Sequence, residues 1–325
     1  MRLSCAFPPM PDTPAHIALA EELGYHRAWV FDTPALQLDV WMTLALAAMR
    51  TSRIGLGPGV LIPSLRHPMV TASAIAHLVE LAPGRVEIGV GAGFTGRNAM
   101  GQRGLKWAHV EAYVRTVQSL LAGEVAEVDG AAVQMLHWPG QAPARPIDVP
   151  WRIAVIGPKG MAAAGRLGAS VFTSRPSAGS NYEGYPGVTA MVSGAVLDPG
   201  EPMDSPRMLA TAGPGVAILY HLAHERRDGS VTQMPNGERF AELVAAVPEG
   251  QRHLAVHRGH LSQLNDIDRQ ILGSEMLARS PLAHPAPDVP AWLDSYAAMG
   301  VTELAYEPMG DIPEALTRLA RAAGL

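Results

Sequence analysis

Strand-like and helix-like segments alternate along this chain with short connections, and this alternation constrains the fold more than any other feature. In the first half, the predicted strands lie at residues 2–7, 28–32, 53–62 and 85–93, and the predicted helices at 13–24, 40–51, 67–82 and 107–123. Repeated strand–helix–strand units are right-handed and place their strands side by side in a parallel sheet. The chain therefore belongs to the α/β class.

The second half continues the alternation with one interruption. Further strands are predicted at 151–157, 170–174, 189–197 and 303–308, a hairpin in 124–138 turning at Asp129-Gly130, and helices at 205–227, 237–247 and 292–300. Eight strands suit a closed (β/α)₈ TIM barrel, formed here by one domain over 1–325. The segment 176–287 is less regular, with 251–287 expected to be irregular. We interpret it as an excursion that builds part of the substrate pocket.

Composition excludes several classes of function. Of the 325 residues, 48% are hydrophobic and 17% charged, which allows a large core. The net charge is −5 and no basic run occurs, so nucleic-acid binding has no electrostatic basis. No window of about 18 uncharged apolar residues predicts a membrane span. The amino terminus is expected to be a strand rather than a signal peptide. The single cysteine, Cys5, is expected in the core of a cytoplasmic protein.

Two strand ends carry glycines that would let a flat ligand approach the backbone. The third strand ends at Gly57-Pro58-Gly59-Val60, and the fourth at Gly89-Val90-Gly91-Ala92-Gly93-Phe94-Thr95-Gly96-Arg97. The second run is a poor dinucleotide fingerprint, because it lacks the third glycine and is not expected to open directly into a helix. We predict a bare backbone surface beside a ring system, with Thr95 and Arg97 as polar contacts. A bulge or a tight bend would also explain the glycines.

Charged groups follow other strand ends. Asp32 either orients a ligand or caps a helix, and Arg66 with His67 either faces the pocket or caps the third helix and pairs with carboxylates. The run Gly157-Pro158-Lys159-Gly160 opens a helix of small residues. Free N–H groups at a helix start, together with a lysine, favour a phosphate site over simple capping.

Three histidines, His253, His257 and His260, lie close together in the sequence. A metal site is one interpretation, but their neighbours are arginines and Gly259 argues against a shared helical face. No metal is therefore predicted, and a role in the substrate pocket or in proton handling is preferred.

Several separated motifs, in the same order, resemble the luciferase-like flavin- and F420-dependent oxidoreductases. They are residues 20–25 (AEELGY), 29–32 (WVFD), 51–60 (TSRIGLGPGV), 66–68 (RHP), 83–85 (PGR), 89–93 (GVGAG) and 157–159 (GPK). The similarity covers residues 1–175 and the last 35 residues, and it is weak over 176–287. It is nearest to the methylenetetrahydromethanopterin-reductase branch.

That resemblance implies a deazaflavin, F420, with FMN or reduced FMN as the alternative. It implies a non-proline cis peptide at Gly59-Val60 behind the ring, contacts from Gly91, Gly93, Phe94 and Thr95, and a phosphate on Gly157, Pro158, Lys159 and Gly160. The chain departs from its relatives at Ala169-Ser170-Val171, where they carry Ala-Asp-Gly, which puts hydrogen bonding near the phosphate in doubt. Proton transfer would fall to Asp32, Arg97, His257 or His260.

The expected activity is hydride transfer to or from a small organic substrate, or monooxygenation with reduced FMN and O₂. A flavin reductase would be a partner in the second case, and a homodimer is the expected assembly. A non-catalytic flavin-binding or partner subunit of the same fold is the alternative. A metabolite enzyme on the same barrel rests on fold analogy alone.

Overall fold

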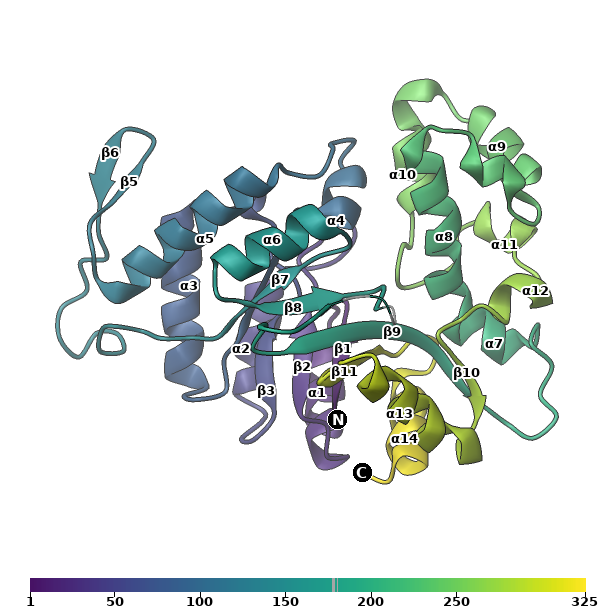
Figure 1. Cartoon of the computed structure of the whole chain (residues 1–325), viewed down its shortest axis with the longest axis horizontal. Helices are drawn as coiled ribbons and strands as arrows, with labels where there is room; N and C mark the ends of the chain where they lie inside the picture. Colours follow the sequence, from purple (N-terminus) through teal and green to yellow (C-terminus); the bar gives the residue numbers. More distant parts are fainter. Residues whose placement is uncertain (177–178, 180) are drawn as a thin grey trace.

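The chain forms a barrel of eight parallel strands in a computed structural model, which describes residues 1–176, 179 and 181–325 (Figure 1). The barrel strands are β1 (Arg2–Phe7), β2 (Arg27–Val30), β3 (Gly55–Pro58), β4 (Ile88–Gly91), β7 (Trp151–Ala154), β8 (Ser170–Thr173), β9 (Val188–Leu197) and β11 (Glu303–Glu307). Their order is β3-β2-β1-β11-β9-β8-β7-β4. Two parallel bridges, Leu56 with Val86 and Leu61 with Val90, join β3 to β4. The predicted barrel is confirmed.

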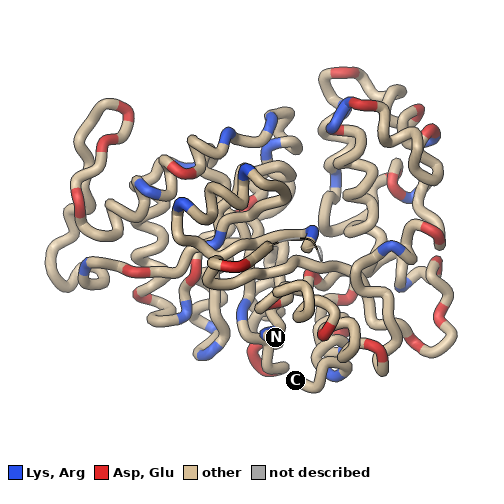
Figure 2. Tube along the Cα trace, in the orientation of Figure 1, with Lys and Arg blue, Asp and Glu red and all other residues tan. Residues whose placement is uncertain are grey.

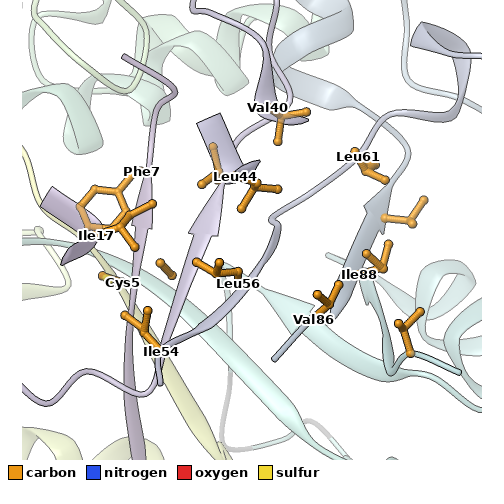
Figure 3. Close-up of a cluster of buried hydrophobic side chains, with 14 of the residues drawn as sticks. Cys5, Phe7, Ile17, Val40, Leu44, Ile54, Leu56, Leu61, Val86 and Ile88 are labelled. Atoms are coloured by element: carbon orange, nitrogen blue, oxygen red, sulfur yellow. The ribbon is translucent and has the colours of Figure 1, made fainter. Parts of the chain in front are cut away.

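Helices surround the barrel and cover the apolar outer face of the strands. They are α1 (Thr13–Glu22), α2 (Val40–Ala48), α3 (Pro68–Leu81), α4 (Phe94–Asn98), α5 (Trp107–Ala122), α6 (Pro158–Arg166), α13 (Val289–Ala298) and α14 (Ile312–Ala323), with 3₁₀ turns η1 (Pro63–Leu65) and η4 (Ala286–Asp288). Asp39 caps α2 by accepting from the N–H groups of Trp41 and Met42. Figure 3 shows part of the core between strands and helices, with Cys5 buried in it as expected.

The excursion is a helical lobe between β9 and the extra strand β10 (Leu282–Pro285). It contains α7 (Pro206–Thr211), α8 (Gly213–Arg226), η2 (Ser230–Gln233), α9 (Gly237–Ala245), η3 (Glu249–Gln251), α10 (Arg252–His257), α11 (Asp268–Ile271) and α12 (Ser274–Leu277). In Figure 1 this green lobe stands beside the barrel, and it has a small apolar core of its own. The expectation that 251–287 is irregular is wrong, because three short helices and β10 lie there. Helices of four to six residues are too short to show a helical period.

Strand β9 changes partner halfway along its length. Its first half pairs with β11, and from Gly194 onward it pairs with β10. At Gly194 a β-carbon would lie 1.9 Å from the carbonyl oxygen of Leu282, so only glycine allows the approach of β10. The segment that leaves the barrel and the segment that returns to it therefore lie side by side.

The predicted hairpin also forms and extends away from the barrel (Figure 1). Strands β5 (Ala126–Val128) and β6 (Ala131–Val133) are antiparallel. The two turn residues, Asp129 and Gly130, have φ of 51° and 79°, as a two-residue turn that follows the strand twist requires.

Charged residues do not segregate in this fold. Figure 2 shows acidic and basic positions interspersed along the trace. In the part of the chain that the structure describes, no helix has the length and apolar character needed to cross a membrane.

The amino-terminal half of the barrel interior is filled by ion pairs around one tryptophan. Arg152 pairs with Glu87 at 2.6 Å and with Glu303 at 3.0 Å, and Arg27 pairs with Glu87 at 3.0 Å. The indole N–H of Trp29 donates to Glu303 at 2.9 Å. Although burial opposes ionisation, the guanidinium groups of Arg152 and Arg27 hold the pKa of Glu303 below its ordinary value. This layer therefore closes the barrel at the amino-terminal ends of its strands.

We expect Arg152→Leu to destabilise the fold by about 3–5 kcal/mol, because it removes the shared partner of two buried carboxylates. Urea unfolding followed by circular dichroism measures the change. The matched control is Arg166→Leu, since Arg166 pairs with Glu111 at 2.6 Å on the surface. That loss should cost far less, because solvent screens an exposed ion pair. Equal losses of stability in the two variants would show that the buried ion pairs stabilise the fold no more than a surface ion pair does.

Candidate functional site

A cavity of about 180 Å³ opens at the carboxyl ends of the barrel strands. Its lining residues are Phe31, Asp32, Thr33, Gly59, Val60, Ile62, Gly91, Ala92, Gly93, Phe94, Thr95, Gly96, Trp107, Ala154, Val155, Ile156, Phe172, Ser174, Met191 and Leu261. Reactive sites of barrel enzymes lie at this end. Of the residues predicted for the site, Asp32, Gly59, Val60, Gly91, Gly93, Phe94 and Thr95 line the cavity.

The peptide bond between Gly59 and Val60 is cis, as the resemblance implied. The side chain of Val60 lies between two glycines of the neighbouring strand end. A β-carbon at Gly89 would come within 2.9 Å of one Val60 methyl group, and one at Gly91 within 2.7 Å of the other. These glycines therefore make room for Val60, which in turn forms part of the cavity surface.

Apolar side chains form most of the remaining wall. Phe31, Phe172 and Leu261 belong to one buried cluster with Trp29, whose ring meets that of Phe172 edge-on at 5.4 Å. At the rim, Phe94 and Ile156 are 50% and 52% exposed. Sequence analysis did not single out Phe31, Phe172, Ile156 or Leu261. Aromatic residues at the carboxyl ends of two predicted strands were the available signal for the first two.

Asp32 is held in an ion-paired loop rather than at a helix cap. Arg66 donates to its two oxygens at 2.7 and 2.8 Å and to Asp39 at 2.8 Å. Asp32 also accepts from the N–H of Ile62 at 3.2 Å. Burial raises the pKa of Asp32, although the hydrogen bonds from Arg66 act to lower it. The carboxylate thus fixes the loop that follows Val60, and His67 caps α3 by accepting from the N–H of Met69.

The glycine run after β4 opens directly into the short helix α4, which corrects the expectation that no helix follows it. The cause is Gly93, whose φ of 80° turns the chain into the helix. On α4 the side chain of Arg97 points away from the cavity wall and donates to Ser64 and to the carbonyl of Arg103. Thr95 lines the cavity and lies 3.5 Å from Nε2 of His260.

The predicted phosphate loop lies at the edge of the cavity, directly after the lining residue Ile156. Gly157 precedes the first residue of α6, and a β-carbon there would meet none of the described residues within 4 Å. Lys159 is exposed. Gly160 has a packing role, since a β-carbon there would lie 2.7 Å from the ring of Trp107. The departure at Ser170 does not affect this loop, because Ser170 pairs with Arg152 at the opposite end of the barrel.

The histidines divide into two groups. His257 and His260 are buried together, with His221 of α8 as a third member that sequence analysis missed. His253 lies instead against Gly101. Burial, together with His221 and His257, lowers the pKa of His260 well below its usual value. Neither His257 nor His260 lines the cavity, but Leu261 follows His260 directly.

A further buried acid, Glu307, ends β11. By strand alternation it shares a face with Glu303 and Ala305, which point into the barrel. One of its oxygens has no hydrogen-bond partner among the described residues, and burial raises its pKa well above the usual value. Burial therefore favours the protonated, uncharged form of Glu307 in the folded protein.

The stability of Glu307→Gln relative to the native protein should increase with pH. The unfolded chain ionises Glu307 near its ordinary pKa whereas the folded chain keeps the proton, so the native protein loses stability as pH rises above about 4.3. Glutamine does not titrate. We expect the variant to gain about 1 kcal/mol or more relative to native between pH 4 and pH 8 in urea unfolding. A difference that does not change with pH would contradict the buried neutral acid.

Comparison with known proteins identifies a family and several relatives that are similar to this chain in sequence. A profile of the family described as Luciferase-like monooxygenase matches residues 6–185. The 5,10-methylenetetrahydromethanopterin reductase of Methanolobus tindarius is 33% identical over 159 residues, 47% of this chain and 47% of that protein. An F420-dependent glucose-6-phosphate dehydrogenase of Beutenbergia cavernae is 35% identical over 177 residues, 48% and 50% of the two chains. The chain thus matches about half the length of these curated relatives.

The fold as a whole is also shared. The solved structure of the coenzyme F420-dependent tetrahydromethanopterin reductase from Methanopyrus kandleri aligns with 99% of this chain and 98% of its own, with a TM-score of 0.69 and 21% identity. At that identity the likeness concerns the fold, and it includes the helical excursion as well as the barrel.

Proposed function

The chain belongs to the luciferase-like monooxygenase family, and from this membership we propose that it is an oxidoreductase whose cofactor is F420. One observation carries the proposal. The cavity at the carboxyl ends of the strands has a smooth apolar wall around Val60 and a helix start at its edge. One of the two curated relatives described above, the glucose-6-phosphate dehydrogenase, is F420-dependent by name.

The residues present fit a flat ring with an anionic tail. Val60, seated between Gly89 and Gly91, offers an apolar surface on one side, and Phe94 and Ile156 at the rim leave apolar area for a ligand to cover. The start of α6, the exposed Lys159 and the space that the described residues leave beside Gly157 suit a phosphate. When bound, F420 supplies hydride transfer.

The chain's own groups would position the ring and exclude water. Arg66 and Asp32 fix the loop from Val60 to Ile62, so the surface behind the ring is held by an ion pair on its far side. Asp32 is thus a positioning residue in this proposal. The hydroxyl of Thr95 is the polar group that faces the cavity from α4. Proton-transfer roles for Arg97, His257 and His260 remain predictions.

The substrate class is a small organic molecule, bound between the cofactor and the helical lobe. Leu261 of the lobe reaches the buried aromatic cluster in the barrel mouth and has φ of 62°, which costs about 1–2 kcal/mol for a residue other than glycine. A residue that lines a cavity and has a strained backbone is often part of a binding site. FMN is the alternative cofactor, in which case a flavin reductase would be the partner that supplies reduced FMN.

Titration of the apo protein with F420 and with FMN, followed by cofactor fluorescence, tests the cofactor. We expect F420 to bind with a Kd of about 1 µM and FMN to bind at least about tenfold more weakly. The reverse order would assign FMN. Failure of both cofactors to bind below about 1 mM would contradict the oxidoreductase and favour a non-catalytic subunit of the same fold.

The site of binding is tested with Ile156→Glu. The new carboxylate lies at the rim, next to the proposed phosphate position, and we expect F420 affinity to fall by at least about tenfold. The matched control is Val125→Glu, another exposed aliphatic position, which lies beside the hairpin away from the cavity. Equal affinity of Ile156→Glu and the native protein would place the cofactor elsewhere.

We propose further that two copies of the chain associate through α2. Leu38, Met42, Leu46 and Met49 form an exposed apolar stripe along this helix, with Met42 and Met49 70% and 72% exposed. Val70 of the neighbouring α3 extends the stripe. A self-complementary stripe of this kind fits a two-fold interface.

Light scattering after gel filtration should give the mass of a dimer for the native protein. The double substitution Met42→Glu with Leu46→Glu should give a monomer with unchanged circular dichroism, because two buried charges per copy are not tolerated. The control is Leu254→Glu, an exposed position on α10. A native monomer, or a dimer that survives the double substitution, would contradict this interface.

A further inference from the structure

Three imidazole rings meet inside the helical lobe, next to the cofactor cavity but outside its lining. They belong to His221 of α8, His257 at the end of α10 and His260 in the turn that follows. The three residues are 2%, 3% and 4% exposed. Gly259, with φ of 71°, reverses the chain between the last two and brings their rings to 5.0 Å. Such a buried cluster needs a chemical explanation, because imidazole is polar.

The same nitrogen of each ring points inward. Nδ1 of His260 lies 2.8 Å from Nδ1 of His221 and 3.3 Å from Nδ1 of His257. The outer nitrogens face oxygen atoms. Nε2 of His221 lies 2.9 Å from Asp268, Nε2 of His257 lies 2.5 Å from Glu225, and Nε2 of His260 lies 3.5 Å from the Thr95 hydroxyl.

These contacts constrain where the protons lie. A carboxylate only accepts hydrogen bonds, so a neutral imidazole at His221 or His257 carries its proton on Nε2 and a lone pair on Nδ1. Nδ1 of His260 faces both of these atoms and could donate a proton to only one of them. Two or three lone pairs therefore converge on one point, and a cation at that point would satisfy all of them.

We propose that His221, His257 and His260 bind one divalent transition-metal ion of the zinc class through their Nδ1 atoms. Three neutral imidazoles suit Zn²⁺ and Co²⁺ and do not suit Mg²⁺ or Ca²⁺, which require oxygen ligands. Two nitrogens bound to a tetrahedral Zn²⁺ lie about 3.3 Å apart. The pair at 3.3 Å already has this spacing, and the pair at 2.8 Å needs to open by about half an ångström.

The surroundings have the pattern of a metal site's outer shell. Metal-bound histidines characteristically donate their other N–H to a carboxylate, which fixes the ring. Here both carboxylates are themselves held in place. Glu225 accepts from Asn98 of α4, and Asp268 accepts from the N–H of Asn265. The site would thus tie the lobe to α4 on the barrel and hold the turn that carries Leu261 into the cofactor cavity.

The three proposed ligands differ from the three histidines that lie close together in the sequence, which are His253, His257 and His260. His253 is on α10 but contacts Gly101, and its place is taken by His221, which is 36 residues before His257. His253 therefore serves as a matched control on the same helix.

The test begins with the native protein after dialysis against a chelator. Competition titration with a chromophoric zinc indicator should give one Zn²⁺ per chain, whether or not F420 is added, and Co²⁺ should give the visible absorption of a four-coordinate ion. Absence of Zn²⁺ and Co²⁺ binding up to about millimolar metal would overturn the proposal and leave a shared proton as the occupant of the cluster. Because this measurement uses the native chain, it stands if a variant fails to fold.

Variants then locate the ion. His260→Asn and His221→Asn should each weaken Zn²⁺ binding by at least about 100-fold, and Asp268→Asn, which alters the outer shell, by about 10–100-fold. His253→Asn should bind Zn²⁺ as the native protein does. Zinc should also raise the unfolding temperature of the native protein and of His253→Asn, and not that of His260→Asn. Binding that persists in both ligand variants would place the metal elsewhere and overturn the assignment.

Discussion

The hydrogen bond from Trp29 to Glu303 is the interaction on which the rest of the site depends. Glu303 remains an acceptor because Arg152 and Arg27 lower its pKa, and Trp29 is held upright on this ionic layer. The indole occupies so much of the barrel that a β-carbon at Gly59 would lie 2.7 Å from the β-carbon of Trp29. The ionic layer thus supports Trp29 beneath the cavity, and Gly59, just after β3, is required by the tryptophan as much as by any ligand.

Packing also determines the position of the residues that follow Gly59. Val60 follows Gly59 and lies against the neighbouring strand end, where Gly89 and Gly91 make room for it. Arg66 and Asp32 then hold the loop that follows. Several glycines of this motif are therefore explained by packing against Trp29 and Val60. The same packing forms the surface that the sequence suggested for a ligand. In the proposed complex, the cofactor ring would contact the valine that these glycines accommodate.

The barrel was predictable from sequence because each strand is apolar and each following helix has its own period. The cis peptide at Gly59-Val60 and the branch of the family came from the resemblance, since no period or spacing encodes them. The meeting of His221 with His257 and His260 was not predictable, because it depends on how α8 and α10 pack. Gly160 was assigned to phosphate although Trp107 explains it. Arg97, one of the four expected acid–base groups, instead donates to Ser64.

The partner change of β9 has a consequence for how this protein can vary. The chain leaves the barrel on β9 and returns on β10, and the two strands are hydrogen-bonded neighbours, about 4.8 Å apart. For the barrel, everything from α7 to α12 is a single insertion whose ends are already joined. Lengthening such an insertion costs little, because loop-closure entropy grows only with the logarithm of its length. The lobe can in this sense vary in length at little entropic cost to the barrel, while Leu261 and Glu225 remain points of contact with the barrel.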